Sequence, residues 1–407
     1  MSSDQFSEGF NSSQWSSEMS FNNTEEESIG IPPNLRFTFN MMYGLLFIIG
    51  VPWNLLIVIA TMISDELRRV TTTIYILNLA IADSLYLMWI PVIIHRSVLQ
   101  EWIFGAAMCK TYFFIACLSQ YAAVYFLIML CIDRYLAVCH PHKSRAYRHS
   151  WQKAVICSVF GWSIVAGLMS PLAFYADVKK EKVYMADSPS PVMRYQCAIY
   201  ASSNENFTGN ETSLEETLTK ERQRRRLMTV ATFSIAFLLP MLIMWSLYAR
   251  LLSRMWWRRY RSQSRDSHHR TRKITWLILT ILFTYTVCWS PLWVINMLVE
   301  FAYHIVERMG IQFYYYGQLA YVFNHINSTL NPLLYTFLSA TYRTRTLQVI
   351  RCQRRKPSDM MMMHRSSILG DYHMTTYIRR KMAVAYDQTR KRLSVVTLDN
   401  NNVLAKP

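Results

Sequence analysis

The sequence predicts an all-α membrane protein, with a bundle of seven transmembrane helices followed by a short amphipathic eighth helix. Three observations predict this fold class. The chain of 407 residues is 52% hydrophobic and only 17% charged, which leaves too little polar surface to cover a soluble domain. Seven runs are long enough and apolar enough to cross a bilayer, which takes about 20 residues. Finally, Lys and Arg gather in alternate connecting segments, as they do between membrane spans.

The seven runs cover residues 37–64, 71–94, 111–132, 154–176, 227–249, 274–299 and 309–342, and only Asp83 interrupts one of them. Because the last run exceeds one crossing, we expect its end, from about Phe337, to begin the eighth helix along the membrane face. Single prolines in five of the runs mark expected bends, at Pro91, Pro171, Pro240, Pro291 and Pro332. The predicted transmembrane domain is therefore 37–342, between an N-terminal tail, 1–36, and a C-terminal region, 343–407, that holds the rest of the eighth helix and a disordered tail.

The distribution of charge predicts the orientation. The N-terminal tail and the loops after the second, fourth and sixth runs hold 13 Lys and Arg against 17 Asp and Glu. The remaining loops and the C-terminal region hold 29 against 7. Since basic segments stay in the cytoplasm, we expect a plasma-membrane protein with its N-terminus outside and its C-terminus inside. The net charge of +17 is then a topological bias, so nucleic acid is not an expected partner.

The outer segments carry signs of a secreted environment. Glycosylation sequons begin at Asn11 and Asn22 in the tail and at Asn206 and Asn210 in the second outer loop, which predicts a glycoprotein. Of the eight cysteines, Cys109 and Cys197 are the only two in outer segments, where an oxidising compartment favours a disulfide. That bond would tie the third span to the loop 177–226, for which we expect a β-hairpin. Cys352, in a basic stretch after the last helix, is either a palmitoylation site or a free thiol.

Several polar residues lie where the bilayer makes them costly. Asp133 and Arg134 end the third run, so we expect an ion pair on the water-facing rim that other partners can replace when helices move. Simple anchoring of the helix by Arg134 is the alternative. Asp83 lies mid-span, at a depth similar to that of Asn54, Asn327, Ser328 and Asn331, so these residues can form a hydrated cluster that holds a small cation or a proton. A purely structural hydrogen-bond cluster is the alternative there.

Together the motifs resemble those of the rhodopsin-like (class A) G-protein-coupled receptors over residues 36–352. The motifs are, in order, Asn54, "LAIAD" ending at Asp83, Trp102 before Cys109, "DRY" at 133–135, Trp162, Pro240 with Tyr248, "CWSP" at 288–291 and "NPLLY" at 331–335. "DRYLAVCHP" and "NPLLYTFLS" are most similar to peptide receptors of the somatostatin, allatostatin-C, opioid and galanin group. The resemblance implies a receptor for an extracellular neuropeptide that activates heterotrimeric G proteins, with the inhibitory Gi/o class favoured by family likeness. Arrestin, receptor kinases and membrane lipid are further implied partners.

The resemblance also implies how such a receptor switches. Arg134 would leave Asp133 and turn toward Tyr248 and Tyr335 as the sixth helix swings outward, which opens a cleft for the C-terminal helix of Gα. Trp289 would be the pivot under the ligand. The implied switch residues are Asp133, Arg134, Tyr135, Tyr248, Trp289, Pro291, Asn331, Pro332 and Tyr335.

The implied ligand pocket differs from that of amine receptors. Seven residues after Cys109, amine, somatostatin and opioid receptors carry an aspartate that pairs with a ligand cation, and this chain has Ala116, which argues against a monoamine. Gln120 and Asn296 match polar residues of the somatostatin receptors. The implied pocket residues are Tyr112, Ala116, Gln120, Trp289, Trp293, Asn296, Tyr321 and His325, although ordinary helix packing explains each of them nearly as well. A neutral small molecule or lipid is the alternative ligand.

A sodium site is implied at Asp83, Ser119, Asn327 and Asn331, with Ser119 in place of the serine that relatives carry at Ala123. Other function classes fit less well. A transporter or channel would favour inverted repeats and several acids along a pathway, whereas this chain has one mid-span acid and no evident repeat. An enzyme is not expected, because the sequence has no HExxH motif, phosphate loop or close-set His and Asp cluster, and we expect no cofactor.

Overall fold

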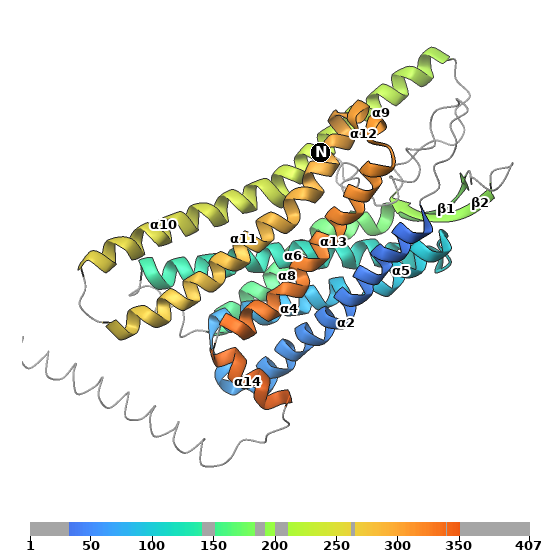
Figure 1. Ribbon diagram of the computed structural model, residues 1–407. Coiled ribbons are helices and arrows are strands. Elements are labelled where there is room, and N and C mark those ends of the chain that lie inside the picture. Colours follow the sequence, from blue (N-terminus) through green and yellow to red (C-terminus); the bar gives the residue numbers. More distant parts are fainter. Residues whose placement is uncertain are drawn as a thin grey trace, which may run out of the picture. The chain divides into compact units, whose positions relative to one another are not determined.

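The computed structural model describes residues 32–140, 151–183, 192–199, 211–261, 265–338 and 340–350, in some stretches only as backbone. Long helices run side by side through this part of the chain (Figure 1). The first half consists of α2 (Pro33–Ile63), α3 (Asp65–Arg68), α4 (Thr71–Leu87), α5 (Ile90–Leu99), α6 (Gly105–Cys139) and α8 (Trp151–Tyr175). The second half consists of β1 (Ala176–Val183), β2 (Val192–Ile199), α9 (Glu211–Phe233), the π-helix η3 (Ser234–Leu238), α10 (Leu239–Arg261), α11 (Arg265–Phe301), α12 (Tyr303–Met309), α13 (Ile311–Leu338) and α14 (Ala340–Ile350).

Six helical segments of the described chain are long and apolar enough to cross a membrane, and they coincide with the first six predicted runs: Pro33–Ile63, Thr71–Leu99, Gly105–Cys139, Trp151–Tyr175, Arg222–Trp256 and Ile278–Phe301. The seventh run corresponds to α13, which has 28 residues but is too rich in amides, His and Tyr to count among the six. Its polar side chains Asn324, His325, Asn327 and Asn331 are buried, and α13 packs against α2, α4 and α11. Neighbouring helices, rather than lipid, therefore surround them.

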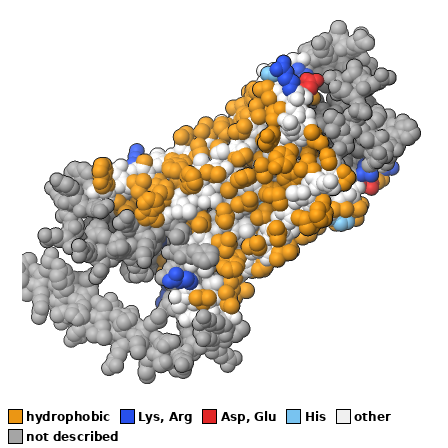
Figure 2. Space-filling model, viewed as in Figure 1, with side chains coloured by type: hydrophobic (Ala, Val, Ile, Leu, Met, Phe, Trp, Pro, Cys, Tyr) orange, Lys and Arg blue, Asp and Glu red, His pale blue; other side chains and the backbone are white. Residues whose placement is uncertain are grey.

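Hydrophobic side chains cover the middle of the helices on the face shown in Figure 2, and charged side chains lie near the helix ends. Among the exposed residues are large apolar ones in the middle of their helices, such as Ile48, Phe160 and Phe283. A soluble bundle does not leave so much apolar surface in water, whereas a bundle in a bilayer presents it to lipid. The predicted fold class, a helical membrane bundle, is confirmed.

The helices extend beyond the predicted runs. The third run becomes α6, so Cys109 lies inside the helix and Asp133 lies six residues before its end. The fifth run is the centre of a continuous helix from Glu211 to Arg261. Hydropathy marks only the part of a helix that lies in lipid, while Lys, Arg and Glu continue it as good helix formers.

Two of the expected bends are visible as changes in helix type. The second span breaks between α4 and α5, because Pro91 has no N–H to donate to the carbonyl of Leu87. The fifth span contains the wider turn η3 just before Pro240. Helices α8, α11 and α13 continue through their prolines without a break.

The predicted eighth helix and β-hairpin are both confirmed. Helix α14 begins three residues later than expected. Strands β1 and β2 are antiparallel, with Ala176 opposite Ile199 and Val183 opposite Val192. We call the end of the bundle that carries these strands the hairpin end, and the end that carries Asp133 and Arg134 the arginine end.

Buried amide and indole groups join the helices. The Asn54 amide donates to the carbonyl oxygen of Ser328 at 3.1 Å, which links α2 to α13. The Trp162 indole donates to Asn78 Oδ1 at 2.9 Å, which links α8 to α4. Since each group is buried or half-buried, its partner must come from another helix or from its own backbone. These bonds fix the helices around the polar residues that form the candidate site.

Candidate functional site

A disulfide fixes the hairpin to the bundle. The expected bond between Cys109 of α6 and Cys197 of β2 is present, with their Cα atoms 5.7 Å apart. Further bonds hold β2 against the end of α5 and the segment that follows it. The Trp102 amide donates to Tyr195 O at 2.8 Å, and Arg194 Nη1 donates to Leu99 O at 3.1 Å. The hairpin is therefore a fixed part of this end.

Below the disulfide, one face of α6 presents three of the predicted pocket residues. Tyr112, Ala116 and Gln120 follow one another at intervals of four, which places them on the same side of the helix. The Tyr112 ring packs edge-on to Trp89, with centroids 5.4 Å apart. Ala116 contributes no polar atom, so no acid lies on this face between Tyr112 and Gln120.

Gln120 is buried and bonded to α13. Its Nε2 donates to Asn324 Oδ1 at 3.2 Å, and the same oxygen accepts from the Tyr86 hydroxyl at 2.8 Å. Sequence reasoning missed Asn324 and Tyr86. Asn324 lies three and seven residues before Asn327 and Asn331, so helical spacing alone could have placed it on their face.

His325 is enclosed by aromatic rings. Its Nδ1 lies 2.8 Å from Tyr321 O, a geometry in which the ring N–H donates to the carbonyl. The imidazole stacks on Tyr86 at 4.5 Å and meets Tyr43 edge-on at 5.2 Å. His325 thus packs against Tyr43 and Tyr86, neighbours that the sequence did not indicate, and its place in the ligand pocket stays a prediction.

The predicted pivot on α11 lies in the core. Trp289 is buried two residues before Pro291, and its ring centroid is 5.5 Å from that of Tyr285. Asn296, nearly two turns further toward the hairpin end, is half-buried. Of the three predicted pocket residues of α11, Trp289 therefore lies deepest, and Trp293 and Asn296 lie closer to the hairpin end.

Trp293 packs toward the fifth span. Its ring lies 5.5 Å from Phe233 and 6.1 Å from Phe237, on either side of the junction between α9 and η3. These rings connect α11 to the π-helix. Any shift of α11 at this level must repack them.

A small cavity lies between α4, α6, α11 and α13. Its volume is about 10 Å³, roughly what a single water molecule needs, and its polar lining consists of Asp83, Ser119, Asn324, Asn327, Ser328 and Asn331. The Asn331 amide donates to Asp83 Oδ2 at 2.9 Å. Within the described part of the chain, the Oδ1 atoms of Asp83, Asn327 and Asn331 have no hydrogen-bond partner. All four predicted sodium residues therefore line this cavity, and the three free oxygens of Asp83, Asn327 and Asn331 are of the type that a hard cation takes as ligands.

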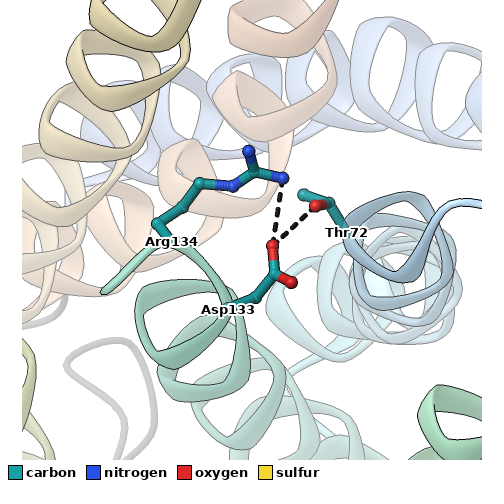
Figure 3. Close-up of polar contacts among 3 residues, drawn as sticks. All are labelled: Thr72, Asp133 and Arg134. Atoms are coloured by element: carbon teal, nitrogen blue, oxygen red, sulfur yellow. Dashed lines mark hydrogen bonds and ion pairs between the residues drawn. The ribbon is translucent and has the colours of Figure 1, made fainter. Parts of the chain in front are cut away.

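At the arginine end, the expected ion pair joins Arg134 Nη2 to Asp133 Oδ2 at 3.0 Å. Thr72, at the start of α4, donates its hydroxyl to the same carboxylate oxygen at 2.6 Å (Figure 3). The expectation of a water-facing rim is wrong, because the Arg134 and Asp133 side chains are only 8% and 1% exposed. Helix α6 runs past them and the first turn of α4 packs over them. Removing one member of such a pair leaves a buried charge with too few partners.

The other predicted switch residues lie on the helices around this pair. Tyr248 of α10 is buried, and Tyr135 packs edge-on to His140 at 5.7 Å. Pro332 lies inside α13 one residue after Asn331. Tyr335 lies in the same helix, but its side chain falls outside what the structure describes. The predicted glycosylation and lipidation sites Asn11, Asn22, Asn206, Asn210 and Cys352 also lie outside the described residues.

Similar proteins fit this arrangement. Chemerin-like receptor 2 of Mus musculus is 26% identical to the chain over 310 residues, which are 75% of this chain and 76% of the relative. Somatostatin receptor type 4 of Rattus norvegicus is 26% identical over 323 residues, covering 78% and 73%. Galanin receptor type 1 of Rattus norvegicus is 26% identical over 320 residues, covering 78% and 83%.

The family described as 7 transmembrane receptor (rhodopsin family) matches residues 53–335. The match begins in α2, ends in α13 and includes the Asp133 and Arg134 pair, the cavity and the predicted pocket residues. Proteins of this family are signalling receptors of the plasma membrane that cross it several times, and they are not enzymes. The match covers well over half of the chain, so the chain belongs to the rhodopsin family of seven-transmembrane receptors.

Proposed function

We propose that this receptor binds an extracellular neuropeptide and activates heterotrimeric G proteins of the inhibitory Gi/o class. The observation that carries the peptide is the distance along α6 between the disulfide that anchors the hairpin and the buried polar side chain of Gln120. Cys109, which anchors the hairpin, lies eleven residues above Gln120, and eleven residues span about 16 Å of helix. An extended chain of about five residues covers that length, whereas a compact amine does not.

The charges agree with a peptide ligand. Between the hairpin and Gln120, the α6 face offers a tyrosine and an alanine but no acid, so a lone cation would find no counter-ion there. The hairpin itself carries exposed charges, at Asp177 and Lys180. A peptide with both apolar and charged side chains can use both levels, which favours peptides over a neutral lipid. The names of the somatostatin and galanin receptors among the relatives support the same class of ligand.

The proposed orientation places the hairpin end outside the cell and the arginine end in the cytoplasm. The counts of Lys and Arg in alternate segments support it, and so do the four sequons on the proposed outer side. The domains are then an outer tail, 1–36, the transmembrane domain, 37–342, and a cytoplasmic region, 343–407. Arrestin and receptor kinases are proposed partners of the cytoplasmic side.

Signalling is proposed to proceed through the buried pair. A peptide that pushes on Trp293 and Trp289 shifts α11 at Pro291, and the aromatic contacts with η3 repack. Movement of α11 at the arginine end frees Arg134 from Asp133 and opens the cleft for Gα. Sodium at Asp83, Ser119, Asn327 and Asn331 would stabilise the resting state, because it neutralises a buried carboxylate.

A neuropeptide library tested on cells that express the chain, with dissociation of each Gα class as readout, tests the proposal. We expect at least one peptide to act through the inhibitory class. In Gln120→Leu its potency should fall about three- to tenfold, the effect of one lost hydrogen bond. Gln152→Leu is the matched control, since Gln152 is exposed at the arginine end of α8. Silence toward all peptides together with a response to a lipid would refute the peptide assignment.

A further inference from the structure

Two arginines lie where α2, α5 and α13 come together at the hairpin end. Phe39 of α2, Ile93 of α5 and Val322 of α13 pack in one apolar cluster. Arg36 lies three residues before Phe39, and Arg96 lies three residues after Ile93, so each is about one helical turn closer to the hairpin end and on the same side of its helix. Both arginines therefore stand over the same apolar cluster.

Two tyrosines connect these arginines to the predicted ligand pocket. The charge of Arg96 acts on the hydroxyl groups of Tyr112 of α6 and Tyr314 of α13, and the charge of Arg36 also acts on Tyr314. All four side chains are half-buried. Screening limits such interactions to about 10 Å, so the four groups lie close together. Since Tyr112 is a predicted pocket residue, the arginines lie at the end of the pocket that is nearest the hairpin.

The helices around the arginines carry no acid there. Helices α2, α5 and α13 contain no Asp or Glu at all, and α6 contains none before Asp133. Glu101, just after α5, accepts a hydrogen bond from the Tyr195 amide of β2 at 3.4 Å. The walls of this site therefore bring positive charge to the pocket, and their sequence supplies no negative charge to balance it.

The guanidinium group of Arg36 is available to a ligand. It makes no ion pair with a described residue, and its Nε is enclosed without a hydrogen-bond partner among those residues. The two Nη atoms bond to no described residue either, but they are not among the enclosed atoms, so a ligand reaches them without moving a helix. A half-buried cation with so few partners is costly, and a carboxylate that binds its Nη atoms recovers part of that cost.

We propose that Arg36 and Arg96 bind a carboxylate of the peptide, which makes the ligand an acidic peptide. A guanidinium group binds a carboxylate through two parallel hydrogen bonds, and the hydroxyl groups of Tyr112 and Tyr314 are further donors. Tyr112 lies eight residues before Gln120, which is about 12 Å along α6. About four residues of extended peptide cover that length, so the carboxylate lies about four residues from the part of the peptide that reaches Gln120. The inference rests on the proposed peptide function.

The receptor's own N-terminal tail is the rival source of a carboxylate. Residues 1–35 contain six acids and no base, and three of these acids, Glu25–Glu27, end nine residues before Arg36. We assign the site to the peptide because Arg96 also lies beside Tyr112, in the predicted pocket. The experiments below separate the two sources.

The first experiment tests the site without any peptide. Phenylglyoxal modifies the arginines of the full-length receptor in lipid nanodiscs, and mass spectrometry measures the rate at each position. Glutarate is the carboxylate probe, and glutaramide at the same ionic strength is its uncharged control. We expect glutarate to slow the modification of Arg36 and Arg96 about tenfold and glutaramide to slow neither. Arg222 of α9 and Arg308 of α12 are exposed and should react at the same rate in both.

Three outcomes of this experiment would overturn the site. The first is equal slowing of all four arginines, which would mean a general effect of anions. The second is protection by glutaramide equal to that by glutarate. The third is a lack of reaction at Arg36 without any probe, which would show that its guanidinium group is closed to ligands.

The second experiment tests the class of peptide. Two peptide libraries differ only in that each Asp or Glu of the first is Asn or Gln in the second, and each peptide is made with a free and an amidated C-terminus. In cells that express the chain, with G-protein dissociation as readout, an active peptide should lose about tenfold in potency when its carboxylate becomes an amide. The position of the sensitive carboxylate distinguishes an acidic side chain from the C-terminus. Equal potency of all four forms would overturn the acidic class.

Receptor variants link that carboxylate to the arginines. Arg36→Gln and Arg96→Gln should each lower the potency of the acidic peptide about tenfold and leave that of its amide counterpart unchanged. Arg222→Gln is the matched control and should change neither. If Arg36→Gln does not reach the cell surface, Arg96→Gln carries the same test. An equal loss for the acidic and the amide peptide would overturn the contact.

Two further results separate the sources of failure. In a receptor with Glu25→Gln, Glu26→Gln and Glu27→Gln, the effect of Arg36→Gln on the acidic peptide should persist, and its disappearance would make the tail the occupant. If no peptide of either library is active while glutarate still protects Arg36 and Arg96, the proposed peptide function fails and the carboxylate site stands.

Discussion

Replacing Thr72 by valine should raise the ligand-free activity of the receptor. The Thr72 hydroxyl donates to Asp133 Oδ2 at 2.6 Å, and the same oxygen pairs with Arg134 at 3.0 Å. The other carboxylate oxygen, Oδ1, is buried and has no partner within the described residues. Valine has nearly the same shape as threonine and no hydroxyl, so Asp133 loses one of its two partners in the resting arrangement. The bond belongs to the arrangement in which Asp133 holds Arg134, so its loss should destabilise that arrangement more than the proposed active state, in which Arg134 has left Asp133.

The size of the effect follows from the burial of the group. A hydrogen bond to a buried charge contributes about 1.5–3 kcal/mol, which is about ten- to a hundredfold in an equilibrium constant. If the active state is populated at about 1% without ligand, within the usual range for a minor state, it should rise to between roughly 10% and 50%. Ligand-free nucleotide exchange should increase accordingly.

Binding of a non-hydrolysable GTP analogue to membranes, normalised to receptor number, measures this activity. Thr72→Ser keeps the hydroxyl and should restore low activity. Thr73→Val is the matched control, because Thr73 is also buried in the first turn of α4 and donates no bond to Asp133. Ligand-free activity in Thr72→Val equal to that in Thr73→Val would refute the role of this bond in the resting state.

Three further predictions test other parts of the structure. Cys109→Ser and Cys197→Ser should each lower thermal stability and surface expression. In the chain-entropy model, a disulfide across 88 residues contributes about 4–5 kcal/mol to the free energy of unfolding. The double variant should lose no more stability than either single variant. A double variant with additive losses would contradict a shared bond. Gly161→Ala should lower the free energy of unfolding by about 1–3 kcal/mol, because the new Cβ would overlap the Tyr125 ring. Gly167→Ala on the same helix should leave it almost unchanged, since a Cβ there meets no atom within 4 Å. Equal melting temperatures for the two variants would contradict this packing. Asp83→Asn should abolish the effect of sodium on peptide affinity at constant ionic strength, and a persistent effect would argue against the cation site.

The hairpin end was largely predictable from the sequence. Cys109 and Cys197 are the only cysteines in the outer segments, so their pairing followed by elimination once the runs had been ordered. The runs themselves are local features, because each span needs about 20 apolar residues whatever its neighbours are. The ends of the helices were not predictable in this way, since charged residues continue a helix beyond the lipid.

The partners of the buried polar groups came only from the tertiary structure. Thr72 and Asp133 are 61 residues apart, and Gln120 and Asn324 are 204 apart. Hydropathy indicates that a helix crosses the membrane. It does not indicate how the helix is rotated about its axis or which helix lies beside it. Rotation and neighbours depend on packing between side chains of distant segments. The sequence alone therefore determined the number and order of the membrane spans, the hairpin and the eighth helix, while the contacts that would carry the signal were decided only when the helices came together.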